Sequence, residues 1–270
     1  MNVPIDNPIL DIRSYSFRVG RKEILREVSF SVRRGEYLSI VGPNGAGKTT
    51  LLKCLDRIYT GGTGAISIAG RPLERYSQRE LARRLSYVPQ IDGRVFPFSV
   101  EQFVLMGRYP YLSPFTSVGH TDREAVTAAL ERTGVAEFAD RRLDTLSGGE
   151  RQKVYIAAAL AQGAEVLLLD EPTTFLDYRH QGEVRDLLAR LNQDCRATIV
   201  AVTHDLNRAV LDSHRIVALR EGAVVFCGPS RDVMRPEILQ EIYGTTFMLM
   251  RHPQADLPII VPQCPVEGAS

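Results

Sequence analysis

Apolar residues fall into short runs along the first third of the chain, and glycine-rich turns separate these runs. The runs are rich in β-branched and aromatic residues, which favour strands. The pattern predicts strands at 9–17, 23–32, 36–41, 65–69 and 85–88, and helices at 48–57 and 78–84. The first part of the chain is therefore expected to be rich in β-structure.

The second half of the chain shows a different pattern, in which apolar strands alternate with helices. Strands are predicted at 166–169, 198–202 and 215–219, and helices at 122–133, 150–162, 178–191, 206–211 and 236–243. Such alternation is typical of a parallel sheet covered by helices. We expect one α/β domain over residues 1–270, with a helical insertion at about 91–162 and a tail at about 229–270.

The amino-acid composition excludes some classes of protein but does not identify the function. An apolar content of 44% in 270 residues is ordinary for a soluble globular protein. The 33 basic and 32 acidic residues nearly cancel, which gives no reason to expect a nucleic-acid partner. The sequence shows neither a secretory signal nor 18 consecutive apolar residues. We therefore expect a cytoplasmic protein whose membrane role, if it has one, depends on a partner.

A glycine-rich segment follows the strand predicted at 36–41. It consists of Gly42, Pro43, Asn44, Gly45, Ala46, Gly47, Lys48, Thr49 and Thr50, and it fits the pattern Gly-x4-Gly-Lys-Ser/Thr. Its glycines let backbone N–H groups surround phosphate oxygens, and the following helix points its positive end at them. Lys48 would reach the β- and γ-phosphates, and the Thr49 hydroxyl would bind Mg²⁺. The segment predicts a site for a nucleoside triphosphate, with ATP and Mg²⁺ as its ligands.

Two carboxylates follow the buried strand predicted at 166–169. Because ligand chemistry in parallel sheets gathers at the carboxyl ends of the strands, Asp170 and Glu171 are expected beside the phosphates. Asp170 would hold Mg²⁺ through water, and Glu171 would position or deprotonate the water that attacks the γ-phosphate. By themselves the two acids could simply cap a loop. Together with a phosphate-binding loop they indicate hydrolysis.

Two further strand ends carry polar side chains. His204 follows the strand at 198–202 and could hydrogen-bond the γ-phosphate. Gln90 follows the strand at 85–88 and could offer its amide to Mg²⁺ or to the attacking water. The other histidines are expected to be structural or solvated: His120, His180, His214 and His252.

A second anion-binding nest is predicted where the helix at 150–162 begins. Ser147, Gly148, Gly149 and Glu150 open this helix, and Ser147 suits the N-cap. Exposed N–H groups and the helix dipole would also bind a phosphate there. Since one chain then carries two nests for a γ-phosphate, we infer that the second nest serves the nucleotide of another copy.

These segments occur in the order of the Walker A, Q-loop, signature, Walker B, D-loop and H-loop motifs, with Asp177 at the D-loop position. From about residue 10 to 228 the chain resembles the ATP-binding-cassette (ABC) ATPases. The resemblance implies a P-loop NTPase (RecA-like) core with an N-terminal antiparallel β part and an inserted α-helical subdomain. It also implies a head-to-tail homodimer, with each ATP enclosed between the Lys48 loop of one copy and Ser147–Gly149 of the other.

The chain departs from the family pattern at two positions. Glu150 stands where many members carry glutamine. Val19 stands where the family usually has an aromatic residue that stacks on adenine. Phe17 lies two residues earlier, on the same strand face, and we hypothesise that it stacks on adenine instead.

The segments 85–90, 100–111 and 171–177 resemble those of bacterial importer ATPases for iron(III)-siderophores, haem or cobalamin. This resemblance implies a peripheral protein at the cytoplasmic face of the membrane, bound to two integral membrane permease subunits. An extracytoplasmic substrate-binding protein would deliver the cargo.

Two aromatic segments of the insertion, 95–98 and 109–112, suit a groove that receives a helix of a membrane subunit, or form the small core of the insertion itself. Gln90, at the hinge into the insertion, would link the γ-phosphate to this surface.

Two other classes stay open. A soluble ABC ATPase of the iron–sulfur cluster assembly type shares the signature at 146–150, and only the importer-like segment 107–110 argues against it. ABC proteins that act on DNA or ribosomes generally carry two cassettes or a long coiled coil, and this sequence shows neither.

Overall fold

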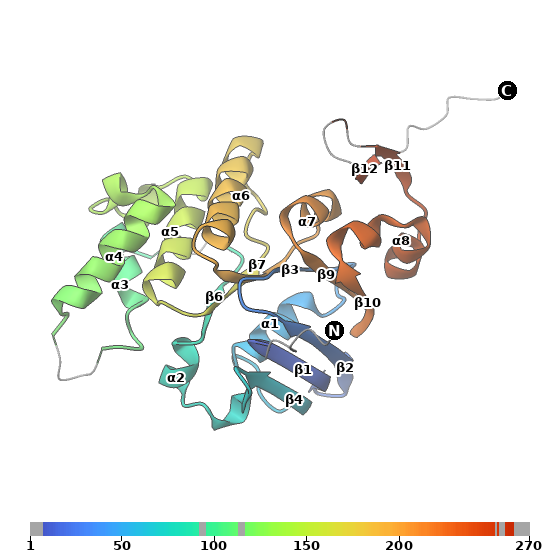
Figure 1. The fold of residues 1–270 in the computed structure, drawn as a ribbon. Coiled ribbons are helices and arrows are strands. Elements are labelled where there is room, and N and C mark those ends of the chain that lie inside the picture. Colours follow the sequence, from blue (N-terminus) through green and yellow to red (C-terminus); the bar gives the residue numbers. More distant parts are fainter. Residues whose placement is uncertain (1–7, 92–95, 113–116, 252, 254–256, 262–270) are drawn as a thin grey trace, which may run out of the picture.

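The computed structural model describes residues 8–91, 96–112, 117–251, 253 and 257–261. A six-stranded sheet with the order β10-β9-β3-β8-β7-β6 crosses the middle of the molecule (Figure 1). Its strands are β3 (Tyr37–Val41), β6 (Leu85–Val88), β7 (Val166–Asp170), β8 (Thr198–Val202), β9 (Arg215–Arg220) and β10 (Ala223–Pro229). All neighbours are parallel except β10, which is antiparallel to β9. The predicted parallel sheet is confirmed.

Successive residues of the central strands face two different layers, as the period of a strand requires. Leu38 of β3 joins the core around α1 (Lys48–Leu55), whereas Tyr37 joins the core around α6 (Tyr178–Gln193). Figure 1 shows α6 and α7 (Leu206–Asp212) on the opposite side of the sheet from α1. Because both faces are covered, β7 and β8 are buried along their whole length.

A second, antiparallel sheet packs on the far side of α1. Its order is β2-β1-β4-β5, from β1 (Leu10–Val19), β2 (Lys22–Val32), β4 (Thr63–Ile68) and β5 (Arg71–Pro72). Apolar side chains of both sheets and of α1 form one core. This sheet is the N-terminal antiparallel part that the family resemblance implied. The 3-10 turn η1 (Leu73–Arg75) and the helix α2 (Gln78–Ala82) lead from it to β6.

Three helices form a separate layer beside β6 and pack around a core of their own. They are α3 (Val100–Met106), α4 (His120–Thr133) and α5 (Gly148–Ala161), with short 3-10 turns η2 (Ala136–Phe138) and η3 (Leu143–Thr145) between the last two. The pattern of apolar residues did not predict α3 as a helix. A capping box starts it, in which the Ser99 hydroxyl accepts from the Gln102 N–H.

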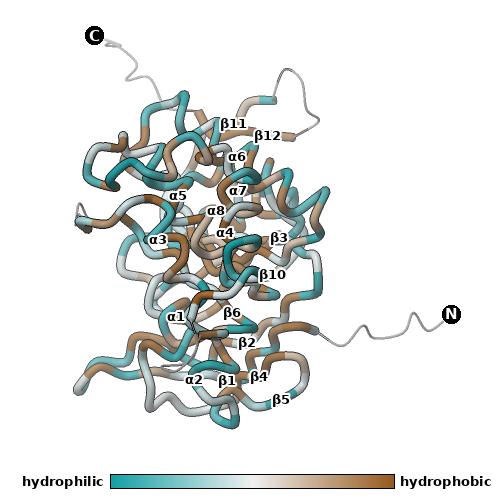
Figure 2. The backbone as a smooth tube through the Cα atoms, turned by 90° about the vertical axis from the view of Figure 1, so that its left-hand side faces the viewer, coloured by the Kyte–Doolittle hydropathy of each residue, from teal (hydrophilic) through white to brown (hydrophobic). Residues whose placement is uncertain are grey.

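The last part of the described chain packs at the β9–β10 side of the sheet. It comprises η4 (Ser230–Met234), α8 (Pro236–Tyr243) and a hairpin of β11 (Met248–Arg251) with β12 (Pro258–Val261). Figures 1 and 2 both place this hairpin at the end of the molecule opposite β1, β2 and β4. Within the described residues, no helix has the length and apolar character needed to cross a membrane.

Candidate nucleotide-binding site

The predicted site residues follow the carboxyl ends of four parallel strands. β3 leads into the loop 42–49, β7 ends at Asp170, β8 leads to His204, and β6 leads to Gln90. The register pairs Asp170 with Val202, so β7 and β8 end at the same level. The structure therefore gathers these residues along one edge of the sheet, where open α/β sheets bind ligands.

The loop 42–49 has the backbone geometry of an anion nest. Gly42, Gly45 and Gly47 have φ angles of 138°, 79° and 99°, which glycine adopts without steric cost. A side chain at Gly42 is excluded as well, because its Cβ would lie 2.0 Å from the carbonyl oxygen of Leu219. The loop thus requires glycine for two separate reasons.

Lys48 lies inside this loop. Its ammonium group donates to the carbonyl oxygens of Gly42 and Pro43 at 2.8 and 2.9 Å, and the residue is 6% exposed. Burial lowers the pKa of Lys48, and the nearby carboxylates of Glu171 and Asp170 oppose that shift. The ammonium group of Lys48 is therefore held inside the loop by two backbone carbonyl groups.

Thr49 and Asp170 meet at the start of α1. The Thr49 hydroxyl donates to Asp170 Oδ1 at 2.9 Å, and the Tyr87 hydroxyl donates to Oδ2 at 3.0 Å. Burial raises the pKa of Asp170, and the two hydrogen bonds oppose this. A hydroxyl and a carboxylate are oxygen ligands of the kind that Mg²⁺ takes together with phosphates and water. The residues therefore fit Mg²⁺. Sequence analysis missed Tyr87, whose contact depends on β6 lying next to β7.

Glu171 and His204 are in contact. Nδ1 of His204 lies 3.1 Å from Oε2 of Glu171, and the Thr174 hydroxyl donates to the same oxygen at 2.7 Å. The Glu171 backbone has a φ of 49°, an uncommon value for a residue with a side chain. The Glu171 side chain is 18% exposed and that of His204 is 57% exposed, so both remain accessible from the edge of the sheet. The structure thus joins the predicted general base to the predicted sensor of the γ-phosphate.

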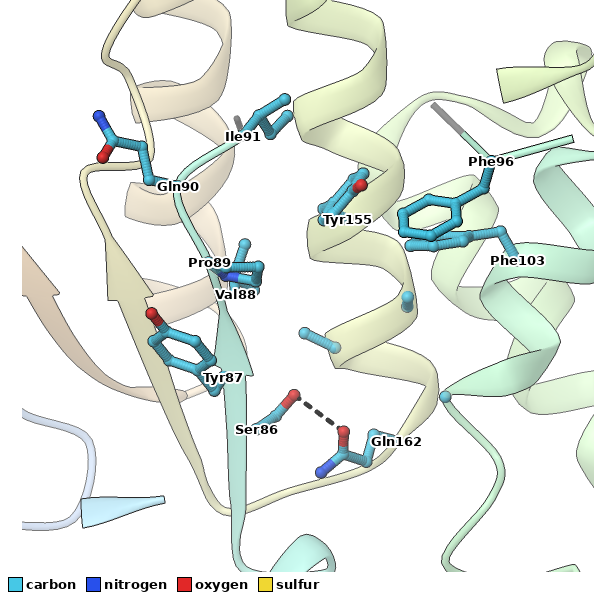
Figure 3. Close-up of a pocket in the computed structure, with 13 residues that line it drawn as sticks. Ser86, Tyr87, Val88, Pro89, Gln90, Ile91, Phe96, Phe103, Tyr155 and Gln162 are labelled. Atoms are coloured by element: carbon cyan, nitrogen blue, oxygen red, sulfur yellow. Dashed lines mark hydrogen bonds between the residues drawn. The ribbon is translucent and has the colours of Figure 1, made fainter. Parts of the chain in front are cut away.

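Gln90 is exposed at the end of β6. Figure 3 shows its side chain directed away from Phe96 and Tyr155. No hydrogen bond among the described residues joins Gln90 to Thr49, Asp170 or Glu171. Its contact with Mg²⁺ or water stays a prediction.

The second predicted nest opens α5. Ser147 is the N-cap, its hydroxyl accepts from the Glu150 N–H at 3.3 Å, and Glu150 accepts from the Ser147 N–H at 2.7 Å. This capping box leaves the N–H groups of Gly148 and Gly149 in the unpaired first turn. Within the described residues, no hydrogen bond joins this turn to the loop 42–49. One chain therefore presents the two nests separately.

Comparison with known proteins identifies the family. The sequence profile described as "ABC transporter" matches residues 25–174, more than half of the chain. This chain belongs to the ABC transporter family. As in the ATP-binding subunits of that family, its activity is ATP hydrolysis, and the predicted enzyme class is confirmed.

Relatives of this ABC ATPase are similar to it over most of their length. The iron(3+)-hydroxamate import ATP-binding protein FhuC of Bacillus subtilis is 40% identical over 240 residues, with 89% of each chain covered. The hemin import ATP-binding protein HmuV of Streptomyces coelicolor is 41% identical over 247 residues, covering 90% of this chain and 86% of the relative.

Solved structures show the same architecture. A metal-chelate type ABC transporter in an inward-facing conformation matches with a TM-score of 0.82 at 28% identity, covering 96% of this chain and 98% of the other. A bacterial ABC transporter cassette solved as a dimer matches with a TM-score of 0.70 at 27% identity, covering 82% and 99%. The predicted fold class is confirmed.

Phe17, the predicted adenine-stacking residue, is buried in this structure. In this ABC ATPase the residue is 6% exposed, and its ring stacks on Tyr59 with the ring centroids 5.7 Å apart. The strand face that carries Phe17 packs into the core around α1, and Tyr59 covers one face of the ring. This position does not favour Phe17 as the residue that stacks on adenine, and its role stays a prediction. Val19, two residues further on, is 58% exposed.

His180 lies directly against the signature turn, although the sequence indicated only a structural or solvated histidine. Its Nδ1 lies 2.8 Å from a carboxylate oxygen of Asp177, the N-cap of α6. A Cβ on Gly149 would lie 2.2 Å from Cδ2 of the imidazole, so the ring packs on the backbone of that glycine. In this chain the D-loop and the signature are therefore in contact through His180.

A groove of about 410 Å³ lies between β6 and the helical layer (Figure 3). Its walls come from the end of β6, from Phe96 and Phe103, and from Tyr155 and Gln162 of the α5 segment. The Phe103 ring contacts the other two aromatic rings, with its centroid 6.1 Å from that of Phe96 and 4.8 Å from that of Tyr155. Phe96 itself is 38% exposed, so the groove has an accessible aromatic edge.

Proposed function

We propose that this ABC ATPase is the ATP-hydrolysing subunit of a membrane importer for a metal chelate, of the iron(III)-siderophore, haem or cobalamin class. The observation that carries the proposal is its similarity, over about nine-tenths of the chain, to import ATP-binding proteins for a hydroxamate chelate and for hemin. Two copies would bind two permease subunits at the cytoplasmic face of the membrane. A substrate-binding protein outside the cell would deliver the cargo.

In this proposal the edge of the central sheet binds and hydrolyses ATP. The N–H groups of the loop 42–49 and the ammonium of Lys48 bind the β- and γ-phosphates. Thr49 and Asp170 would hold Mg²⁺, which when bound neutralises phosphate charge. Glu171 accepts a proton from the attacking water or orients it, and His204 holds the Glu171 carboxylate and contacts the γ-phosphate.

A second copy supplies the rest of each site. The free N–H groups of Gly148 and Gly149, with Ser147, would bind the γ-phosphate held by the other copy's Lys48. The separation of the two nests in one chain, together with the dimeric cassette among similar structures, supports this arrangement. Closure of the dimer around ATP would then be the step that drives transport.

The groove beside β6 is the proposed docking site for a helix of a permease subunit. It is lined with aromatic residues, and Gln90 at its margin follows a strand whose end lies at the nucleotide site. Residues about 91–162 would move as one unit with that helix, and Gln90 would couple the motion to the γ-phosphate.

The second aromatic segment does not line this groove. The guanidinium of Arg79 lies over the ring of Tyr109, and those of Arg83 and Arg108 both lie over the ring of Tyr111. We therefore limit the docking proposal to Phe96 and its neighbours. Residue 95 of the first segment lies outside the described residues.

A pull-down from detergent-solubilised membranes of the native host tests this function. We expect a polytopic membrane protein to co-purify in stoichiometric amount with the tagged wild-type chain, and much less of it with Phe96→Ser. Tyr109→Ser, which alters an exposed aromatic residue outside the groove, is the matched control and should retain the partner. Recovery of soluble partners only would contradict the proposal and favour an assembly ATPase of the iron–sulfur type.

A further inference from the structure

The helix α7 begins two residues after His204, and Asp205 lies between them. Asp205 is its N-cap, and the carboxylate of Asp205 accepts from the Arg208 N–H at 3.0 Å. Seven residues are too few for a helix to be stable by itself, so contacts with neighbouring elements set the position of α7. Whatever holds the first turn of α7 therefore also holds His204.

The two ends of α7 are held by different parts of the chain. At its C-terminal end, Arg185 of α6 makes a two-pronged salt bridge with Asp212 at 2.9 and 3.2 Å. The Ser230 hydroxyl donates to the carbonyl oxygen of Val210 at 3.1 Å, close to the same end. Neither contact reaches the first turn.

The C-terminal hairpin holds the first turn through Asn207. The Asn207 amide donates from Nδ2 to the carbonyl oxygen of Ile260 at 3.0 Å, and its Oδ1 accepts from the Ile260 N–H at 2.8 Å. A primary amide that both donates and accepts in this way replaces a peptide group on a neighbouring strand. The side chain of Asn207 therefore pairs with the free edge of β12.

The C-terminal hairpin is not part of either large sheet and depends on contacts with its neighbours for its position. β11 and β12 form a two-stranded sheet of their own, and such a hairpin is only marginally stable by itself. Leu249 and Ile260 pack against the apolar core that also contains Leu206 of α7, while Met248 and Met250 are about half exposed. One face of the hairpin thus covers α7. The two hydrogen bonds between Asn207 and Ile260 fix where β12 lies along α7.

We propose that the C-terminal hairpin is a strap that positions His204 against Glu171, and that Asn207 is the positioning residue through which it acts. The strap fixes the first turn of α7 and so the distance between the imidazole and the carboxylate, 3.1 Å in this structure. The inference rests on the proposed catalytic roles of Glu171 and His204, and it holds for any cargo.

Steady-state ATPase measurements on the full-length protein test the strap. Asn207→Leu removes both hydrogen bonds at similar volume, and we expect kcat to fall about tenfold while the KM for ATP changes less than about twofold. Asn207→Asp keeps the acceptor for the Ile260 N–H and should recover part of kcat. Ser230→Ala removes a hydrogen bond from the other end of α7 and should leave kcat within about twofold of wild type.

A double-variant cycle separates positioning from general destabilisation. If Asn207 acts through His204, then Asn207→Leu should change kcat by less than about twofold in a His204→Ala background. Ile260→Pro removes the backbone donor without changing any residue of α7. It should reproduce the Asn207→Leu effect, and it replaces that variant if Asn207→Leu folds poorly. Additive losses of kcat, or an unchanged kcat in both single variants, would overturn the strap. If His204→Ala itself left kcat unchanged, the proposed role of His204 would be refuted, and the strap proposal with it.

Discussion

Among single residues, Asp56 shows the strongest effect of burial on a carboxyl group outside the nucleotide site. It is the C-cap of α1, and burial raises its pKa to about 7. No hydrogen bond or ion pair with its side chain is found among the described residues. The ionised form is therefore disfavoured in the folded protein and not in the unfolded chain.

Asp56 is therefore predicted to lower the free energy of unfolding by an amount that depends on pH. Because the folded pKa lies above the unfolded value, the folded state binds more protons between about pH 4 and pH 7, and stability falls as the pH rises through this range. Asp56→Asn should therefore be more stable than wild type at pH 8, with a much smaller difference at pH 5. Urea denaturation at the two pH values measures this, with Asp194→Asn, an exposed C-cap of α6, as control. Equal differences at both pH values would contradict it.

At the scale of elements, α5 joins the helical layer to the central sheet. Its first turn carries Ser147, and its C-cap is Gln162. The Gln162 amide donates to the carbonyl oxygen of Leu85 at 2.7 Å and to that of Ala82, and it accepts from the Ser86 hydroxyl at 3.1 Å. Figure 3 shows the hydrogen bond between Ser86 and Gln162, two of the residues that line the groove.

Removing this contact should loosen the junction. Gln162→Ala leaves two partly buried carbonyl groups without their donor, so we expect a loss of about 1–3 kcal/mol in the free energy of unfolding. Gln193→Ala, at the exposed end of α6, is the matched control and should cost less than about 0.5 kcal/mol. Urea denaturation compares the two. A Gln162→Ala variant as stable as the control would show that the junction is held by apolar packing.

At the scale of the whole molecule, the two proposed halves of the nucleotide site lie on different layers of the chain. Lys48 and Glu171 lie at the sheet edge, whereas Gly148 and Gly149 open a helix of the other layer. In the proposed arrangement, a complete site therefore requires two copies.

This arrangement predicts opposite behaviour for two variants of the same site. Glu171→Gln should bind ATP, hydrolyse it at least about 100-fold more slowly and accumulate as a dimer with ATP and Mg²⁺, because closure is retained while the base is lost. Lys48→Ala should bind ATP weakly and stay monomeric under the same conditions. Size-exclusion chromatography with light scattering and an ATPase assay provide both readouts. Normal turnover by Glu171→Gln would show that another group acts as the base.

The sequence by itself determined the elements whose chemistry lies in one continuous segment. The loop 42–49 needs its glycines for its own backbone angles, and Asp170 and Glu171 follow a strand that is apolar on both faces. Because parallel strands end at one edge, the order of these segments also predicted that they would meet. The strands at 85–88 and 198–202 and the helix at 236–243 were predicted with their observed bounds.

The tertiary structure alone decided contacts between segments that are far apart in the chain. Alternation placed Phe17 and Val19 on one strand face. Only the tertiary structure shows that Phe17 is buried in the core around α1 and that Val19 is exposed. Likewise the contacts of Tyr87 with Asp170 and of Asn207 with Ile260 join residues 83 and 53 positions apart. Local propensity carries no information on such pairs, because packing of the sheets and helices brings them together.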